Sequence, residues 1–305
     1  MTGLRHKYTL SIALGLASLM LPGQGRAGDA QHTTHRVDSR MVLLPVTVTD
    51  RNGKTITDLR REQFQILDDS RPVEIVSFTR EEAPVSLGIV LDLSGSMQGK
   101  RNHAIHALRE ILKRTGPDDE AFLVTFAETP EMRVEFTRDV NSVVDPLLFA
   151  GTKGATALVD AVYMGLHEMK NARNPRRVLI VISDGGDNNS RYTEGELTSL
   201  ALESDTQVYS VSIHEAAMNI QERAGVFLLS KLSETTGGLQ FVVRDRRDLP
   251  EIGAKLATAI NNLYVLGYRP PEGFLSGKWR SVKIKLDNST GPKLRVTART
   301  GYYPD

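Results

Sequence analysis

Two short and almost wholly apolar runs constrain the fold of this chain more than any other feature. They are residues 85–91 (VSLGIVL) and residues 178–183 (VLIVIS). A strand with one face in water alternates apolar and polar residues, whereas a strand covered on both faces is apolar throughout. Both runs therefore predict central strands of a mostly parallel sheet that carries helices on its two faces.

The sequence around these runs repeats the same alternation of strand and helix. Further short apolar segments predict strands at 121–126, 132–136, 208–213 and 239–243. Apolar residues at helical spacing predict helices at 103–114, 157–169, 193–204, 224–235 and 249–263. Because strands that alternate with helices form doubly wound sheets, we expect an α/β fold with a mostly parallel six-stranded sheet.

The two ends of the chain carry a different pattern, in which short strands follow one another without helices. These strands are predicted at 41–49, 64–67 and 73–78, and again at 264–268, 282–286 and 294–298. Their close spacing and the turn residues between them indicate small antiparallel β segments. We expect the C-terminal segment to pack with the N-terminal one as a small accessory unit. The expected organisation is a signal peptide (1–27), a linker (28–37), an N-terminal β segment (38–83), the α/β domain (84–262) and a C-terminal β segment (263–305).

The first 27 residues have the composition of an export signal. Arg5 and Lys7 precede an apolar run at 8–21, and small residues flank a cleavage position near Ala27. The run is about 14 residues long, shorter than the ~20 that a membrane-spanning helix needs. No later run is long and apolar enough to span a membrane. We therefore expect a secreted or periplasmic protein with no stable membrane insertion after cleavage.

Charge and cysteine content exclude several classes of function. The chain has 38 basic and 37 acidic residues, and removal of residues 1–27 leaves 35 basic residues against 37 acidic ones. A chain with this balance is not a general nucleic-acid binder, which would carry a basic excess. Cysteine is absent, so the chain has no disulfide, no thiolate metal site and no thiol nucleophile.

Polar residues with oxygen side chains follow two of the predicted buried strands. Asp92, Ser94 and Ser96 come directly after the strand at 85–91, and Asp184 comes directly after the strand at 178–183. Ligands of doubly wound sheets bind beyond the carboxyl ends of the strands. We expect these side chains to meet there if the two strands are neighbours, with Thr156 arriving from a glycine-rich loop at 151–156.

Two carboxylates and three hydroxyls form a set of oxygen ligands without histidine or cysteine. Oxygen-only sites suit hard divalent cations, and the small number of ligands favours Mg²⁺ or Mn²⁺ while leaving Ca²⁺ open. Two negative charges only balance such a cation, so it keeps affinity for one further anion. An Asp or Glu carboxylate of a protein partner would supply that anion.

The D-x-S-x-S sequence at Asp92, Ser94 and Ser96, together with Thr156 and Asp184, resembles the metal-ion-dependent adhesion site of von Willebrand factor type A domains. The resemblance covers residues 84–262. It implies a Rossmann-like fold, Mg²⁺ at the site and binding of a protein partner through a carboxylate. It also implies that the three hydroxyls ligate the metal, while the two carboxylates act directly or through water.

The whole layout also resembles that of exported bacterial proteins related to von Willebrand factor type A. The features that carry this second resemblance are the signal, the short β stretch before the site and the C-terminal sequence at 300–304 (TGYYP).

Three enzyme or nucleotide-binding motifs fit the sequence less well. The segment at 95–100 is one residue short of a phosphate-binding P-loop, and Arg101 stands where that motif needs Ser or Thr. A phosphatase with an aspartyl nucleophile at Asp92 would need a second acid where Ser94 stands. A serine hydrolase would need a G-x-S-x-G turn, which neither serine has.

Other polar residues near the site have ordinary structural interpretations. His103 and His106 are expected to be surface or helix-packing residues. His214 is expected in a loop at a strand end, with contact to a partner as the alternative. Asp187 is interpreted as a turn residue, with a hydrogen-bond acceptor behind the metal ligands as the alternative, and Asp248 as a residue that helps to start the last helix.

The sequence thus favours an exported, non-enzymatic module that binds a protein partner through a metal ion. Two alternatives stay open. One is a structural or assembly protein of the cell envelope, in which the metal stabilises the loops. The other is a metal-assisted hydrolase, although the sequence nominates no base for it.

Overall fold

The computed structural model describes residues 41–80, 83–214, 218–271, 277–287 and 293–304. Residues 39–305 form one compact unit. The predicted signal peptide (1–27) and linker (28–37) lie outside the described residues, so their assignments remain predictions. Among the described residues, no helix is long and apolar enough to cross a membrane.

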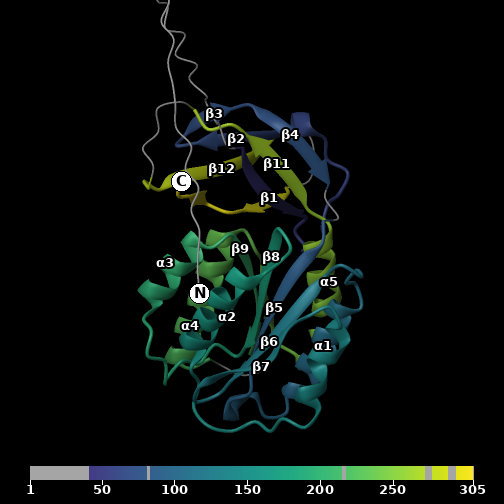
Figure 1. Ribbon diagram of the computed structural model, residues 1–305, viewed down its shortest axis with the longest axis vertical. Helices are drawn as coiled ribbons and strands as arrows, with labels where there is room; N and C mark the ends of the chain where they lie inside the picture. Colours follow the sequence, from purple (N-terminus) through teal and green to yellow (C-terminus); the bar gives the residue numbers. More distant parts are fainter. Residues whose placement is uncertain (1–40, 81–82, 215–217, 272–276, 288–292, 305) are drawn as a thin grey trace, which may run out of the picture. The chain divides into compact units, whose positions relative to one another are not determined.

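The centre of the chain folds around a six-stranded sheet with the order β10-β9-β8-β5-β6-β7 (Figure 1). Its strands are β5 (Val85–Asp92), β6 (Glu120–Phe126), β7 (Pro130–Thr137), β8 (Arg176–Ser183), β9 (Thr206–Ile213) and β10 (Gln240–Val243). Every pair is parallel except β6 with β7. Every residue of β5 is buried, as the apolar run predicts.

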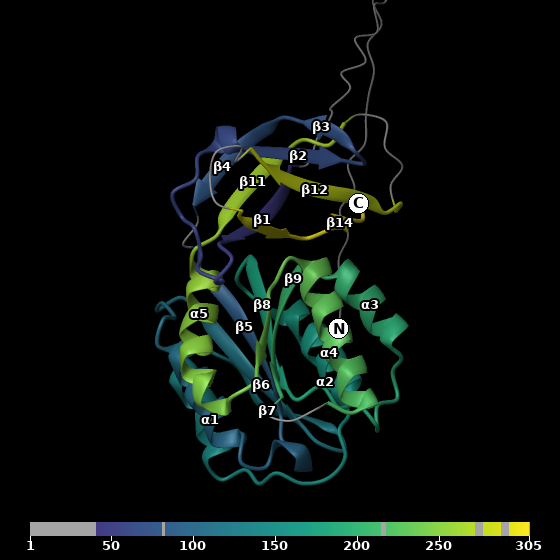
Figure 2. The ribbon, with the colours of Figure 1, turned by 180° about the vertical axis from the view of Figure 1, so that it is seen from behind.

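Helices cover both faces of this sheet, and they lie on opposite sides of it in Figures 1 and 2. They are α1 (Arg101–Leu112), α2 (Leu158–Glu168), α3 (Glu194–Glu203), α4 (Ile220–Thr236) and α5 (Leu249–Asn261). Buried side chains of α1 and α5 share one apolar cluster with the sheet, and those of α2, α3 and α4 share the other. The predicted α/β fold class is confirmed.

Helix α4 begins about one turn before the predicted start at residue 224. The Asn219 side chain accepts a hydrogen bond from the Glu222 backbone N–H at 2.9 Å, and the Glu222 carboxylate accepts one from the Asn219 N–H at 2.9 Å. This capping box satisfies two backbone donors of the first turn. The first turn contains mainly polar residues, so apolar spacing did not reveal it.

Two further details differ from the sequence-based expectation. A 3-10 helix at Val140–Leu148 packs four apolar side chains on the α1 side of the sheet, where no element was predicted. Asp248 precedes α5, but its side chain makes no capping hydrogen bond. Asp245 instead accepts a hydrogen bond from the Arg247 N–H at 2.9 Å, which caps a short 3-10 helix before α5.

The end segments of the chain form two further four-stranded sheets. Their strands are β1 (Val42–Thr49), β2 (Phe64–Asp68), β3 (Arg71–Val73), β4 (Ile75–Arg80), β11 (Tyr264–Tyr268), β12 (Arg280–Leu286), β13 (Arg295–Ala298) and β14 (Gly301–Tyr302). One sheet has the order β13-β1-β11-β4 and the other has the order β14-β12-β2-β3. Each sheet joins strands from both ends of the chain, and the apolar side chains of both form one core.

A buried ionic network holds the two ends of the chain together. The Asp68 carboxylate on β2 is fully buried and accepts hydrogen bonds from Arg280 Nε at 2.8 Å and Nη2 at 2.7 Å. The hydroxyls of Tyr268 and Tyr302 donate to the same carboxylate at 3.0 and 3.3 Å. Asp68 lies in the N-terminal segment and its three partners lie in the C-terminal one. The network therefore links segments that are distant in sequence.

Replacing Arg280 with Met is expected to lower the free energy of unfolding by about 3 kcal/mol, because it leaves a carboxylate buried without its counter-ion. Urea denaturation measures this change. The control is Lys113→Met, which breaks an exposed ion pair with Glu110 and should change stability by less than about 0.5 kcal/mol. Equal effects of the two substitutions would contradict a structural role for the Asp68 network.

Candidate functional site at the carboxyl ends of β5 and β8

Strands β5 and β8 are neighbours in the central sheet, and this places two carboxylates together. The strands pair in parallel from Val85 opposite Arg176 to Leu91 opposite Ile182. Asp92 is the last residue of β5, and Asp184 directly follows β8. Both side chains are buried. The condition for the predicted convergence, that the two strands be adjacent, is met.

The loop after β5 is folded against the Asp92 carboxylate. Asp92 Oδ1 accepts a hydrogen bond from the Ser94 N–H at 2.8 Å, and Oδ2 accepts one from Ser183 Oγ at 2.6 Å. A short 3-10 helix at Gly95–Met97 then turns the chain. The Ser94 and Ser96 hydroxyl oxygens lie 3.1 Å apart, so both hydroxyls occupy the same side of this turn.

Asp184 has one carboxylate oxygen engaged and one free. Oδ2 lies 3.0 Å from Nζ of Lys100, whose side chain is 15% exposed. Oδ1 is buried and has no hydrogen-bond partner among the described residues. A Cβ atom added to Gly186 would lie 3.9 Å from both Asp184 Oδ1 and the Thr156 hydroxyl oxygen. These two oxygens therefore border the same small space.

Thr156 is held in place by bonds to both neighbouring loops. Its backbone N–H donates to the Asn188 side-chain oxygen at 2.9 Å, and its carbonyl accepts from the Asn188 N–H at 2.9 Å. The loop before it is bonded to the loop after β5 through Gly95 N–H to Gly154 carbonyl at 3.2 Å and Lys153 N–H to Leu93 carbonyl at 3.0 Å. The three loops therefore form one connected rim.

Burial and charge perturb the titration of the site. Burial raises the pKa of Asp92 to about 6, against the hydrogen bonds from Ser183 and Ser94, and the neighbouring Asp184 carboxylate adds to the increase. Burial also lowers the pKa of His214, which follows β9, and the carboxylates of Asp184 and Glu222 oppose this shift. Lys100 is the cation that contacts the Asp184 carboxylate.

The available ligands suit a hard cation more than a histidine-based metal centre. Within the described residues, no group of three or more His, Asp or Glu side chains could hold a metal ion. A cation at this edge would therefore need the hydroxyls as well as the two carboxylates. The unpartnered Asp184 Oδ1 beside the Thr156 hydroxyl fits such a ligand set, because a buried carboxylate oxygen otherwise loses its hydration without compensation.

Sequence reasoning missed two residues that organise the site and assigned a third mainly to a turn. Ser183 and Lys100 contact the two carboxylates directly. Asp187, interpreted as a turn residue, accepts hydrogen bonds from the Leu158 N–H at 3.0 Å and the Ser190 hydroxyl at 2.6 Å, so it also caps the start of α2. Ser183 could have been found from its place at the end of a buried strand, where a polar residue is unusual. Lys100 carried no such signal.

Comparison with known proteins identifies the central part of the chain. Residues 87–186 match the family model of the von Willebrand factor type A domain, which confirms that the chain contains such a domain. An uncharacterized protein of Borreliella burgdorferi (strain ATCC 35210 / DSM 4680 / CIP 102532 / B31) is 22% identical in an alignment of 214 residues that covers 59% of this chain. The chain spans 63% of the length of that curated relative.

Solved structures extend the similarity of fold beyond this stretch. A von Willebrand factor type A protein from Catenulispora acidiphila superposes with a TM-score of 0.52 at 11% identity, covering 88% of this chain and 76% of that chain. The von Willebrand factor domain of the type V pili tip protein Mfa5 from Porphyromonas gingivalis has a TM-score of 0.48 at 11% identity, covering 59% of this chain and 96% of that chain. The first similarity supports the fold, and the second is too weak to carry an inference.

A pair of glycines sets the position of α4 against the site. A Cβ atom added to Gly225 on α4 would lie 1.7 Å from the carbonyl oxygen of Gly185, next to Asp184. Gly225→Ala is therefore expected to displace the helix or the loop and to lower the free energy of unfolding by about 3 kcal/mol. Thermal or urea denaturation measures the loss.

The control is Gly195→Ala on α3, where the added Cβ lies 3.8 Å from its nearest neighbour, an ordinary contact. This change should leave stability unchanged or raise it by up to about 1 kcal/mol through helix propensity. A Gly225→Ala protein as stable as the Gly195→Ala protein would refute the close packing of α4 on the site loop.

Proposed function

We propose that this chain is an exported, non-enzymatic module that binds a protein partner through a divalent cation. The residues that would hold the cation all have oxygen-bearing side chains. Asp92, Ser94, Ser96 and Asp184 lie at or just after the carboxyl ends of β5 and β8, and Thr156 lies in the loop before α2. The observation that carries the proposal is the buried, unpartnered Asp184 Oδ1, which borders the same small space as the Thr156 hydroxyl in a von Willebrand factor type A domain.

Each residue has a specific part in this proposal. Ser94, Ser96 and Thr156 supply neutral hydroxyl oxygens, and Asp92 and Asp184 supply the negative charge. Ser183 and the Ser94 N–H orient Asp92 through their hydrogen bonds. A bound Mg²⁺ or Mn²⁺ supplies two positive charges and an exchangeable ligand position that accepts a carboxylate oxygen. Ca²⁺ would suit the same chemistry less well, because it prefers more oxygen ligands.

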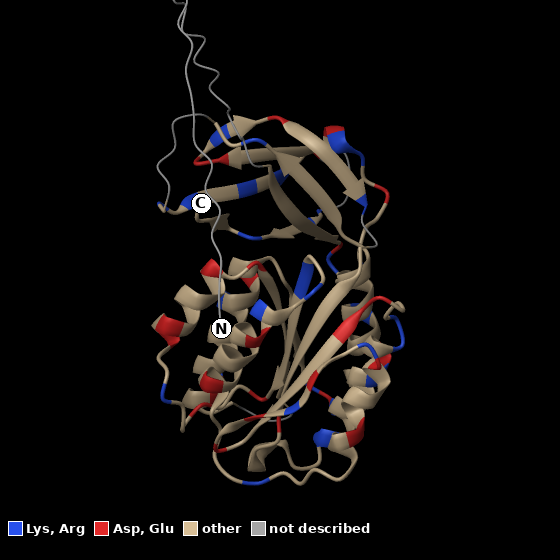
Figure 3. Cartoon of the chain, viewed as in Figure 1, with Lys and Arg blue, Asp and Glu red and all other residues tan. Residues whose placement is uncertain are grey.

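The partner in this proposal is a protein that presents an Asp or Glu carboxylate. Two carboxylates only balance the charge of a divalent cation. The bound cation therefore keeps affinity for one further anion, which the partner's carboxylate supplies. Lysine, arginine and acidic residues are interspersed over the α/β domain in the view of Figure 3. Such a mixed distribution of charged residues does not favour a nucleic acid as partner. Export rests on the basic and apolar pattern of residues 1–27.

The metal-binding part of the proposal predicts that Asp184→Asn weakens Mn²⁺ binding by at least about tenfold, because it removes a charge from the ligand set. Isothermal titration of the purified protein with Mn²⁺ and with Mg²⁺ measures the affinity. Asp118→Asn is the matched control, since Asp118 is exposed and lies away from the site. Equal affinity of the two variants would sink the proposed metal site.

The partner-binding part is tested by capture from an envelope extract in Mg²⁺ and in a chelator. A partner retained only in Mg²⁺, and lost with Asp184→Asn, is the expected result. Thermal stabilisation by Mg²⁺ without any captured partner would instead favour the loop-stabilising role. Hydrolysis that depends on the metal would favour the enzymatic alternative.

Lys100 is expected to compete with the cation, because its ammonium group lies 3.0 Å from Asp184 Oδ2. Lys100→Gln should therefore raise the affinity for Mn²⁺ by about tenfold through removal of a positive charge. The same titration measures the effect, with Lys113→Gln as the exposed control on α1's C-terminal side. Weaker Mn²⁺ binding in Lys100→Gln would show that Lys100 positions Asp184 and does not oppose the cation.

A further inference from the structure

The outer edge of β10 is an unpaired strand edge. β10 is the last strand of the central sheet and pairs only with β9 among the described residues. The carbonyls of Leu239 and Val243 accept hydrogen bonds from the Ser210 and His214 N–H groups of the β9 side, at 3.0 and 2.8 Å. Because alternate residues of a strand face a given neighbour, the backbone groups of Gln240 and Val242 point to the open edge.

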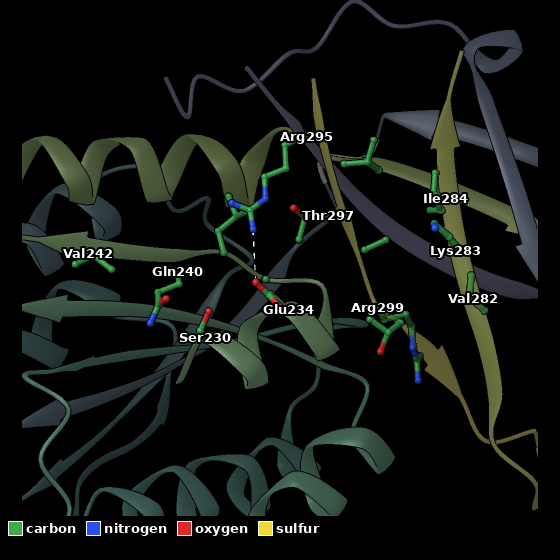
Figure 4. A pocket seen from close by; sticks show the side chains of 15 residues that line it. Ser230, Glu234, Gln240, Val242, Val282, Lys283, Ile284, Arg295, Thr297 and Arg299 are labelled. Carbon is green, nitrogen blue, oxygen red and sulfur yellow. Dashed lines mark ion pairs between the residues drawn. The ribbon is translucent and has the colours of Figure 1, made fainter. Parts of the chain in front are cut away.

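This edge opens into a groove of about 650 Å³ that also borders the terminal sheets (Figure 4). The opposite wall carries Thr297 of β13 and Val282 and Ile284 of β12. β13 is itself an edge strand that pairs only with β1 among the described residues. The open edge of β10 and the strands β12 and β13 therefore line one hollow, in which Val282 is buried and Ile284 is half-buried.

Backbone contacts join the two walls of the groove. The Thr300 N–H donates to the Thr235 carbonyl at 3.0 Å, and Thr236 and Arg299 form an isolated antiparallel bridge. These bonds hold β13 against the end of α4. Backbone contacts therefore help to fix the distance between the two walls of the groove.

The groove and its neighbouring hollow carry an excess of positive charge. Together they are lined by Arg51, Lys255, Lys283, Lys293, Arg295 and Arg299, against Asp50 and Glu234. Three of these cations have acidic partners: Arg295 pairs with Glu234, Lys255 with Glu251 and Arg299 with Asp205. Asp50 Oδ1 already accepts hydrogen bonds from the Asn52 and Lys54 N–H groups at 2.8 and 2.9 Å. Lys283 and Lys293 have no ion-pair partner in the part of the chain that the structure describes. The charge is unusual in a chain whose basic and acidic residues otherwise balance.

From these observations we propose that the groove binds an extended acidic segment of a partner protein, which adds a strand to the edge of β10. The backbone of the segment pairs with Gln240 and Val242. Its side chains alternate between two faces, so one face covers the exposed Val242 side chain while acidic residues on the other reach Lys283 and Arg295, at Arg295 in competition with Glu234. Val242 is 49% exposed, which leaves apolar surface for this contact.

This surface is separate from the proposed metal site. None of the five metal-site residues lines either hollow. Strand addition therefore goes beyond the proposed function, and either one can fail without the other. A nucleic acid would satisfy the charge but not the open backbone groups or the exposed Val242 side chain. A second copy of this chain, paired edge to edge at β10, is distinguished by the test below.

The test measures fluorescence anisotropy of a labelled peptide, acetyl-Val-Glu-Val-Asp-Val-Glu-Val-amide, with the full chain. A counterpart with Lys at each acidic position should bind at least about tenfold more weakly, because the groove is basic. A copy that is N-methylated at alternate residues should also lose binding, because it cannot donate to the strand edge. Equal binding of all three peptides, or no binding of the first, would overturn the proposal.

Matched variants locate the peptide on the protein. Val242→Pro removes an outward N–H without breaking the β9 ladder, and Lys283→Glu reverses a groove charge. Each should weaken peptide binding by about tenfold or more. Val242→Thr keeps the backbone donor, Lys285→Glu changes a lysine of β12 outside the groove, and Asp184→Asn changes only the metal site; all three should bind normally.

Three outcomes overturn the assignment of the groove. The first is retention of binding by both Val242→Pro and Lys283→Glu. The second is equal binding of a single-stranded DNA probe in competition with the peptide. The third is a dimer in gel filtration that Val242→Pro abolishes, which would identify a second copy as the occupant. Lys283→Glu and the N-methylated peptide keep the test valid if Val242→Pro does not fold.

Discussion

The parallel pairing of β5 with β8 is the constraint on which the rest of the structure depends. Both strands are covered by helices on two faces, so their side chains are apolar and their backbone groups must pair with neighbouring strands. Close packing supports the pairing at Gly88, where an added Cβ would lie 2.5 Å from the Phe122 ring. Parallel neighbours end at the same edge of a sheet. Polar residues placed directly after the two strands are therefore forced together.

The accessory sheets depend on a different constraint, the joining of distant ends of the chain. Neither end segment can complete its sheets alone, because β1 and β4 pair with β11, and β2 pairs with β12. Asp68 and Arg280 add a buried ion pair across the same junction. In the sequence, the α/β domain thus lies between the two segments that together form one β unit. This arrangement also creates the groove, since β13 returns to the end of α4.

Much of the fold was predictable because the informative residues are local. Continuous apolar runs identified the central strands, and apolar residues at helical spacing identified the helices around them. The position of Asp92 and Asp184 directly after buried strands could be predicted without any knowledge of distant contacts. The prediction was weaker where polar residues form structure. The first turn of α4 is held by Asn219 and Glu222, and the 3-10 helix at Val140–Leu148 contains a proline, so neither shows a regular apolar period.

By itself, the sequence determined which segments are buried strands and which oxygen-bearing side chains follow them, because burial and turn chemistry are written in neighbouring residues. Only the tertiary structure decided that Lys100 and Ser183 contact the two carboxylates, and that Asp184 Oδ1 lacks a partner. Only the tertiary structure also placed the open edge of β10 beside β13. The physical reason is that such contacts join residues far apart in the chain, and their geometry follows from strand order and loop packing.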